Sequence, residues 1–338
     1  MIESEPQLSQ QELKKIDAEK RPEQAEKLVA FTDKIDLYEF SNKIFEKSNF
    51  EDLSFDDFKN FLIRINGLLR DLPKTERGFD GENVKLDGML ESQLVLAHKD
   101  KEDVLQYAFE SSKSLPREDI SYMLPLIINA VHYFGDGNGR TSRVLRTILE
   151  KNSSKDDFMK KLEQRVSSDG RDYIDVNPSF VNWEIEQHFL KSKGWTETDY
   201  GFTPPNFEKY GTIGGIFEGY RNHPNAKQLS EIERIADSDA SLLTTAILET
   251  YSEKDLNRVV NSSYRHPVIS PELLCKNSSQ SQLQNIVNKY FEYKKECTRL
   301  LVDIFKNPDD FKNPFAPTIT LKEMFIDKVN EEAGKYVK

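Results

Sequence analysis

A strip of apolar residues that runs into a glycine-rich loop constrains the fold of this 338-residue chain more than any other feature. Apolar side chains recur at helical spacing over residues 120–131, before the loop, and over residues 144–149, after it. Such spacing places them on one face of a helix, and that face must be buried against other elements. The sequence therefore predicts two core helices joined by the loop Gly135-Asp136-Gly137-Asn138-Gly139.

Helical spacing also predominates in the rest of the chain, where strand signals are scarce. The clearest segments are residues 37–45, 58–69, 101–111, 158–166, 180–190, 229–250 and 283–305. Ser54 precedes the second of these, and serine is a favoured N-cap residue. The chain is therefore expected to be all-α, with irregular passages at residues 194–220 and 261–281, where Gly, Pro, Ser and Asn interrupt the pattern.

One short β-hairpin is expected before the apolar strip. Residues 75–93 contain two Asp-Gly pairs around the alternating stretch Val84-Lys85-Leu86, which is typical of a hairpin, although an ordinary surface turn is the alternative. Residues 1–29 are rich in good helix formers but poor in large apolar side chains, so we expect a polar helical arm there. A boundary near residue 195 would separate a domain over residues 30–194 from a helical region over residues 195–338.

The amino-acid composition argues against several classes of protein. The net charge of −11 argues against a nucleic-acid binder, because binding the phosphate backbone requires concentrated positive charge. The charged N-terminus lacks the apolar core of a signal peptide, and no apolar run is long enough to span a membrane. Cys275 and Cys297 support neither a disulfide framework nor a zinc site. We therefore expect a cytoplasmic protein, with translocation into a host cell left open.

The glycine-rich loop has the composition of a phosphate site. Its glycines let backbone amides approach a ligand, and the following helix begins with unpaired N–H groups and the positive end of its dipole. Arg140 and Arg143 are three residues apart on that helix, so both guanidinium groups are expected on one face beside the loop, where they would bind phosphate oxygens. Asn138 can add a neutral hydrogen bond.

Two further side chains bring candidate chemistry to this loop. Asp136 lies within it, and a carboxylate beside phosphates is most simply explained by a shared Mg²⁺. His132 precedes it, and imidazole can take a proton from an attacking hydroxyl at neutral pH. Each residue alone also has an ordinary structural interpretation, such as a helix-end histidine or a plain turn. A calcium loop is not supported, because no closing glutamate follows at loop spacing.

Together, residues 132–143 read HYFGDGNGRTSR and match every defined position of the signature HxFx(D/E)GNGRxxR, so that about residues 30–190 resemble the Fic family. The resemblance implies a helical domain with one hairpin, called the flap, and transfer of AMP from Mg·ATP to a Ser, Thr or Tyr hydroxyl of a target protein. The roles it implies are general base for His132, Mg²⁺ ligand for Asp136, phosphate cradle for Gly137, Asn138 and Gly139, and ligands of the β- and γ-phosphates for Arg140 and Arg143.

The resemblance also assigns a target-binding segment. The flap would be residues 82–89, where the backbone of an extended target segment would pair with that of Asn83, Val84, Lys85 and Leu86. Many family members carry proline where this chain has Tyr133, but that position of the signature is undefined.

Regulation is left open by the sequence. Numerous family members inhibit themselves with a helix reading (S/T)xxxE(G/N), and the chain has only two partial matches, at residues 114–118 and 245–249. The first lies too close to the motif helix to reach around it. The alternatives are an inhibitory helix at 245–249, a separate inhibitory partner protein, and an unregulated enzyme such as an effector that acts in another cell.

Other functions are possible on the same scaffold. Transfer of UMP, GMP or phosphocholine is one alternative, and the kinase chemistry of the death-on-curing toxins is another, although that group tends to carry lysine where this chain has Gly139. A catalytically idle Fic fold that serves as a binding module is the alternative from a different class, and the complete set of motif residues disfavours it. Residues 195–338 are expected to select the target or to mediate assembly, as is common for an appended helical region.

Overall fold

The computed structural model describes residues 37–44, 49–73, 78, 85–87, 92–94, 96, 98–167, 178–199, 201–214, 223–313 and 316–335. Most of these residues are helical, and the described strands pair only two at a time, so the predicted all-α class is confirmed at this level. The arm expected over residues 1–29 lies outside the described residues. None of the described helices combines the length and apolarity needed to cross a bilayer.

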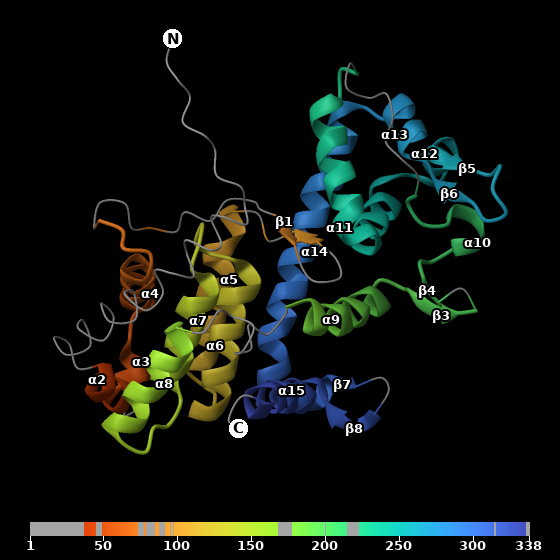
Figure 1. Cartoon of the computed structure of the whole chain (residues 1–338). Helices are drawn as coiled ribbons and strands as arrows, with labels where there is room; N and C mark the ends of the chain where they lie inside the picture. Colours follow the sequence, from red (N-terminus) through yellow and green to blue (C-terminus); the bar gives the residue numbers. More distant parts are fainter. Residues whose placement is uncertain are drawn as a thin grey trace, which may run out of the picture.

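The first half of the chain is built around two adjacent helices, α6 and α7, that flank the glycine-rich loop (Figure 1). The helices there are α2 (Leu37–Lys43), α3 (Asn49–Asp52), α4 (Phe55–Leu69), α5 (His98–Ser112), α6 (Arg117–Val131), α7 (Asn138–Leu149), α8 (Lys155–Ser167) and α9 (Pro178–Ser192). Helix α5 packs on α6, while α4 and α8 pack on α7. The apolar strip is buried as predicted, with Met123, Ile127 and Leu145 in the core.

Helix α4 begins and ends where its sequence predicts. The Oγ atom of Ser54 accepts a hydrogen bond from the backbone N–H of Asp57 at 3.1 Å, which satisfies one of the free donors of the first turn. After the last helical residue, Asp71 takes a left-handed conformation with φ of 57°. The chain therefore turns away from α4 just before Pro73.

The predicted hairpin is present as β1 (Lys85–Asp87) and β2 (Ser92–Leu94), which pair antiparallel with Leu86 opposite Gln93. Lys85 and Leu86 thus lie on its first strand, whereas Asn83 and Val84 fall outside the described residues. Strand β2 lies against α11 (Ala226–Thr250) and shortly precedes α5. The hairpin is therefore placed between the two halves of the chain (Figure 1).

The second half contains two long helices and several short elements. They are β3 (Thr196–Thr198), β4 (Gly201–Thr203), α10 (Phe207–Tyr210), α11, α12 (Glu253–Val259), β5 (Val260–Asn261), β6 (Val268–Ile269), α13 (Pro271–Asn277), α14 (Gln280–Lys306), η3 (Pro308–Asp310), β7 (Lys312–Asn313), β8 (Ala316–Thr320) and α15 (Leu321–Lys335). The passages expected to be irregular contain β3, β4 and α10 in the first and β6 and α13 in the second. Elements of two to seven residues are too short to show a period.

Helix α14 joins the two halves. It packs against α9, α11 and α15 on one side and against α5 and α6 on the other, and Figure 1 shows it running between these groups. The hydrophobic core continues across residue 195, since Leu105 and Ile127 belong to the same buried cluster as Ile247 and Leu301. The region after residue 195 therefore supports the helices that carry the glycine-rich loop.

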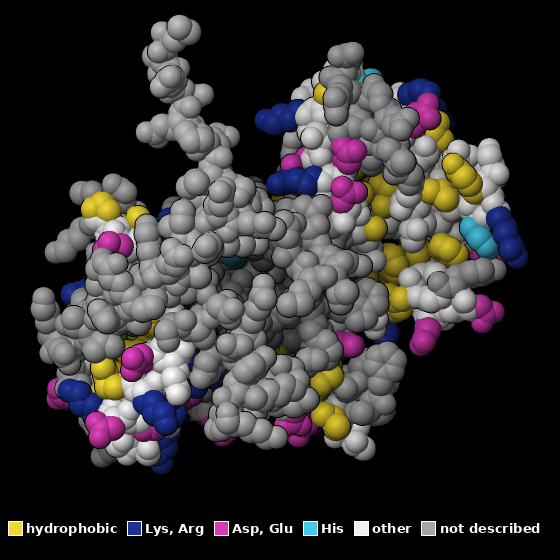
Figure 2. Space-filling model, in the orientation of Figure 1, with side chains coloured by type: hydrophobic (Ala, Val, Ile, Leu, Met, Phe, Trp, Pro, Cys, Tyr) yellow, Lys and Arg dark blue, Asp and Glu magenta, His cyan; other side chains and the backbone are white. Residues whose placement is uncertain are grey.

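Charged side chains are mixed on the visible surface. On the face drawn in Figure 2, the described Lys and Arg side chains are interspersed with Asp and Glu and do not gather into one basic patch.

Cys275 and Cys297 are both free thiols.

Candidate functional site

His132 ends α6 in a left-handed conformation, with φ of 54° and ψ of 61°. This conformation costs a residue with a Cβ atom about 1 kcal/mol, so it requires support from the surroundings. The backbone N–H of His132 donates to the carbonyl of Ile128 at 3.1 Å, and its own carbonyl accepts from Lys101 Nζ at 2.7 Å. Both backbone groups are held, which fixes the direction in which the imidazole leaves the chain.

Asn138, the first residue of α7, closes the loop onto its start. Its Oδ1 atom accepts from the backbone N–H of Phe134 at 2.9 Å, and its Nδ2 atom donates to the Phe134 carbonyl at 2.7 Å. Phe134 itself is fully buried and packs in the helical core. Asn138 therefore shapes the loop with the same amide that was expected to contact a ligand.

Asn66 of α4 holds the middle of the loop. Its Nδ2 atom donates to the Asp136 carbonyl at 2.9 Å and to the Thr141 hydroxyl at 3.1 Å. Gly137 takes a positive φ of 76°, which favours glycine, and a Cβ atom there would lie 3.0 Å from the Asn66 amide nitrogen, a tight contact. Asn66 is not among the residues that the sequence motif indicates, although it lies four residues after Leu62 on the apolar face of α4, where a polar side chain is unusual.

Asp136 and Arg140 form an ion pair across the first turn of α7, with Oδ2 and Nη2 2.9 Å apart. The Asp136 side chain is 66% exposed, whereas that of Arg140 is 6% exposed and also donates to the Leu69 carbonyl at 3.3 Å. The carboxylate is thus open to solvent above a buried guanidinium. Gly139, which follows in the same turn, is half-buried.

Arg143 binds a different part of the structure from Arg140. It lies on the same helix as Arg140, but its Nε atom donates to the carbonyl of Arg165 in α8 at 2.7 Å. Arg140 is tied to the loop through Asp136, while Arg143 is tied to α8. The sequence placed the two arginines on one face without indicating these separate anchors.

The electrostatic environment keeps the His132 imidazole neutral. Burial lowers its pKa to about 4, the positive charge of Lys101 acts in the same direction, and Asp136 opposes both. Burial also lowers the pKa of Lys101 to about 8. A neutral imidazole can accept a proton at pH 7, although at this pKa it is a weak base until nearby negative charge strengthens it.

The low pKa of His132 predicts acid sensitivity. The unfolded chain binds a proton at this residue near pH 6.5 and the folded chain near pH 4, so the folded state loses stability as the pH falls through this window. The loss should reach about 2–3 kcal/mol at pH 4. Urea unfolding of the wild type and of His132→Asn, which tolerates the left-handed conformation, should give curves that diverge below pH 6.5; parallel curves would contradict the shift.

The bonds of Asn138 predict a structural cost for its loss. Asn138→Ala leaves the buried N–H and carbonyl of Phe134 without these partners, which should lower the free energy of unfolding by about 2–3 kcal/mol. Asn60 is exposed on α4 and provides the control, since Asn60→Ala should change stability by less than about 0.5 kcal/mol. Equal effects of the two substitutions in urea unfolding would show that the Asn138 bonds do not hold the loop.

The glutamate of the partial inhibitory match at residues 245–249 binds side chains that lie outside the glycine-rich motif. Glu249 of α11 accepts from Tyr293 and Lys289 and lies 3.5 Å from Lys193 Nζ. These contacts hold its carboxylate among α9, α11 and α14, so Glu249 is not the partner of Arg143 in this structure.

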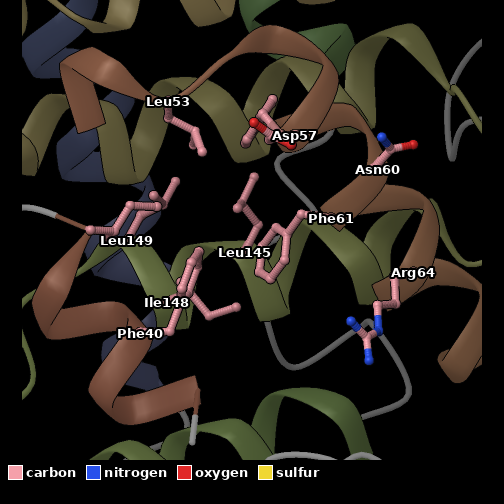
Figure 3. Close-up of a pocket in the computed structure, with 11 residues that line it drawn as sticks. Phe40, Leu53, Asp57, Asn60, Phe61, Arg64, Leu145, Ile148 and Leu149 are labelled. Atoms are coloured by element: carbon pink, nitrogen blue, oxygen red, sulfur yellow. The ribbon is translucent and has the colours of Figure 1, made fainter. Parts of the chain in front are cut away.

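An apolar cavity of about 300 Å³ lies between α2, α4 and α7 (Figure 3). Leu145, Ile148 and Leu149 line it from the C-terminal half of α7, and none of residues 132–143 does. It is therefore separate from the candidate site. Within the described residues, no group of three or more His, Cys, Asp or Glu side chains could hold a metal ion by itself.

Comparisons of the chain with protein-family models, with curated proteins and with solved structures found no match.

Proposed function

We propose that this chain is a protein adenylyltransferase of the Fic type, which transfers AMP from Mg·ATP to a Ser, Thr or Tyr hydroxyl of a target protein. One observation carries the proposal: a half-buried neutral imidazole lies close enough to the exposed Asp136 carboxylate for that charge to affect its pKa, and the carboxylate pairs with the buried Arg140 guanidinium in the first turn of α7. A helix N-terminus with an adjacent arginine favours a polyphosphate, and the imidazole supplies a base beside it.

In the proposed reaction the chain's own residues bind, orient and deprotonate. The first-turn amides of α7 and the Arg140 guanidinium would hold the phosphates, and the imidazole of His132 would take the proton of the target hydroxyl. The hydroxyl oxygen then bonds to the α-phosphorus as the bond to pyrophosphate breaks. Catalysis of this kind depends mainly on positioning and on neutralising charge.

The Asp136–Arg140 ion pair suits a site that is filled by Mg²⁺ and phosphate together. Mg²⁺ in proteins is commonly held by one or two carboxylates plus substrate phosphates and water, so the exposed Asp136 side chain fits it without a larger acidic cluster. The ion would neutralise developing charge on the phosphates. On binding, the carboxylate would exchange Arg140 for the ion, and Arg140 would exchange the carboxylate for phosphate.

Bound phosphate would also adjust the base. Burial and the charge of Lys101 hold the pKa of the imidazole low in the free chain, and the negative charge of a nucleotide beside it would raise that pKa and make the imidazole a stronger proton acceptor.

The assay that tests the proposal uses purified protein with Mg²⁺ and α-labelled ATP, alone and with a cell lysate, beside the His132→Ala variant. Labelled protein that disappears in the variant supports AMP transfer, while label only from γ-labelled ATP would indicate a kinase instead. Labelled UTP, GTP and CDP-choline test the other transferases. A blank with every donor, in the presence of lysate, would leave the idle binding module as the better description.

A further inference from the structure

Lys101 is buried where a charge is unfavourable. It lies on the face of α5 that carries Val104, Leu105 and Ala108, all fully buried, and is itself only 2% exposed. An ammonium group in such surroundings loses hydration that its contacts must offset. A buried lysine at an apolar-face position is therefore expected to have a specific role.

Lys101 contacts the backbone of the proposed base. Its Nζ atom donates to the His132 carbonyl at 2.7 Å, a charge-assisted hydrogen bond. His132 needs such support because its left-handed conformation is disfavoured for a residue with a side chain. If this bond were absent, the peptide after His132 could rotate, and the imidazole would change direction with it.

The first turn of α5, which carries Lys101, also forms ion pairs with the second half of the chain. Lys295 of α14 lies 3.2 Å from Asp100 and 2.6 Å from Asp103, the acids that flank Lys101 on α5. The Lys295 side chain is 19% exposed, so this pair of contacts is partly shielded from water. Helix α14 thus contacts the first turn of α5 through this cation, and it also packs against α6.

We propose that Lys101 is a positioning residue for His132, and that α14 holds it in place through Lys295. The inference rests on the proposed transfer reaction only for its effect on rate, since the positioning itself is a property of the free chain. It gives the region after residue 195 a part in the transfer site that is independent of any role in target selection.

The test compares Lys101→Met, which keeps the length of the stem and removes the donor, with Lys101→Arg, which keeps a charged donor. Lys113→Met is the control, because Lys113 lies at the other end of α5 in a surface pair with Glu110. We expect Lys101→Met to lower kcat by about 10- to 100-fold with an unchanged KM for Mg·ATP, because a misdirected base impairs the chemical step alone. Lys101→Arg should recover part of this loss, and Lys113→Met should resemble the wild type.

A second readout does not depend on activity. The imidazole ¹³Cε1 resonance of His132, assigned by its absence from His132→Ala, should shift in Lys101→Met and stay in place in Lys113→Met. Should Lys101→Met fail to fold, Lys101→Leu also removes the donor from this apolar-face position and provides the same comparison. An unmoved resonance, or a kcat within twofold of the wild type, would overturn the positioning role. If the wild type transfers no nucleotide while the resonance shifts, the proposed function fails and the positioning role stands.

Discussion

Alanine in place of His132 is expected to lower the rate of AMP transfer by at least about 100-fold and to leave Mg·ATP affinity nearly unchanged. The imidazole would act only when the target hydroxyl gives up its proton. The loop does not depend on it, because His132 is held through backbone bonds to Ile128 and Lys101. The elements proposed to bind phosphate, which are the first turn of α7 and Arg140, keep their own contacts in the variant.

Initial rates with labelled ATP measure the rate of AMP transfer, and calorimetric titration measures the affinity for Mg·ATP. His188 provides a control, since this histidine is exposed on α9 and packs against Phe311 rather than against the loop. His188→Ala should transfer AMP at the wild-type rate. If His132→Ala lost nucleotide affinity as strongly as rate, the histidine would be a structural residue of the loop and not the base.

Replacement of Asp239 by alanine is expected to lower the free energy of unfolding by about 3–5 kcal/mol, the largest loss of stability that we predict. Asp239 Oδ2 lies 2.9 Å from Lys294 Nζ, and their side chains are 4% and 11% exposed. Burial lowers the pKa of Lys294, but the charges of Asp239 and Glu186 outweigh it and raise the pKa above its ordinary range. Without Asp239, a buried ammonium would lose its closest counter-charge.

The position of Asp239 adds to the expected cost. It interrupts α11 with non-helical φ and ψ of −160° and 62°, and the Tyr290 hydroxyl also approaches its Oδ2 atom, at 3.4 Å. The Asp239–Lys294 ion pair therefore joins the kink of α11 to α14. Loss of the carboxylate should loosen both helices at the point where they cross.

A double variant distinguishes the cost of an unpaired charge from the cost of a cavity. Asp239→Leu combined with Lys294→Met removes both charges and keeps apolar volume, so it should recover most of the stability lost in Asp239→Ala. Urea unfolding at pH 7 gives the midpoint and slope for all three proteins. A double variant as unstable as the single one, or a single variant within about 1 kcal/mol of the wild type, would show that the ion pair does not stabilise this crossing.

Local patterns predicted the helical architecture because helices are themselves local. The apolar period over residues 120–131 corresponds to α6, and Ser54 caps α4 as its residue type suggests. Helix α13 was missed although Ser270 and Pro271 stand at its start, since seven residues are too few to show a period. The β3–β4 and β5–β6 pairs were missed for the same reason.

The candidate site also combines features that the local sequence predicts with contacts that depend on tertiary packing. His132, Asp136 and Arg140 lie within nine consecutive residues, so a turn between two helices brings them to the same loop, and sequence spacing alone predicts this. The sequence did not indicate that Arg143 would be bound to α8 or that Asn138 would close the loop on Phe134. These partners depend on side-chain packing, which spacing does not specify.

The sequence by itself determined the helices, the loop between α6 and α7, and the residue types at that loop, because apolar period, glycine content and capping act over a few residues. The tertiary structure alone decided what supports the loop. Asn66 reaches the Asp136 carbonyl across 70 residues of sequence and Lys101 reaches the His132 carbonyl across 31. Which carbonyl a buried amide or ammonium meets is set by how α4 and α5 pack against α6 and α7, and that packing is a property of the whole core.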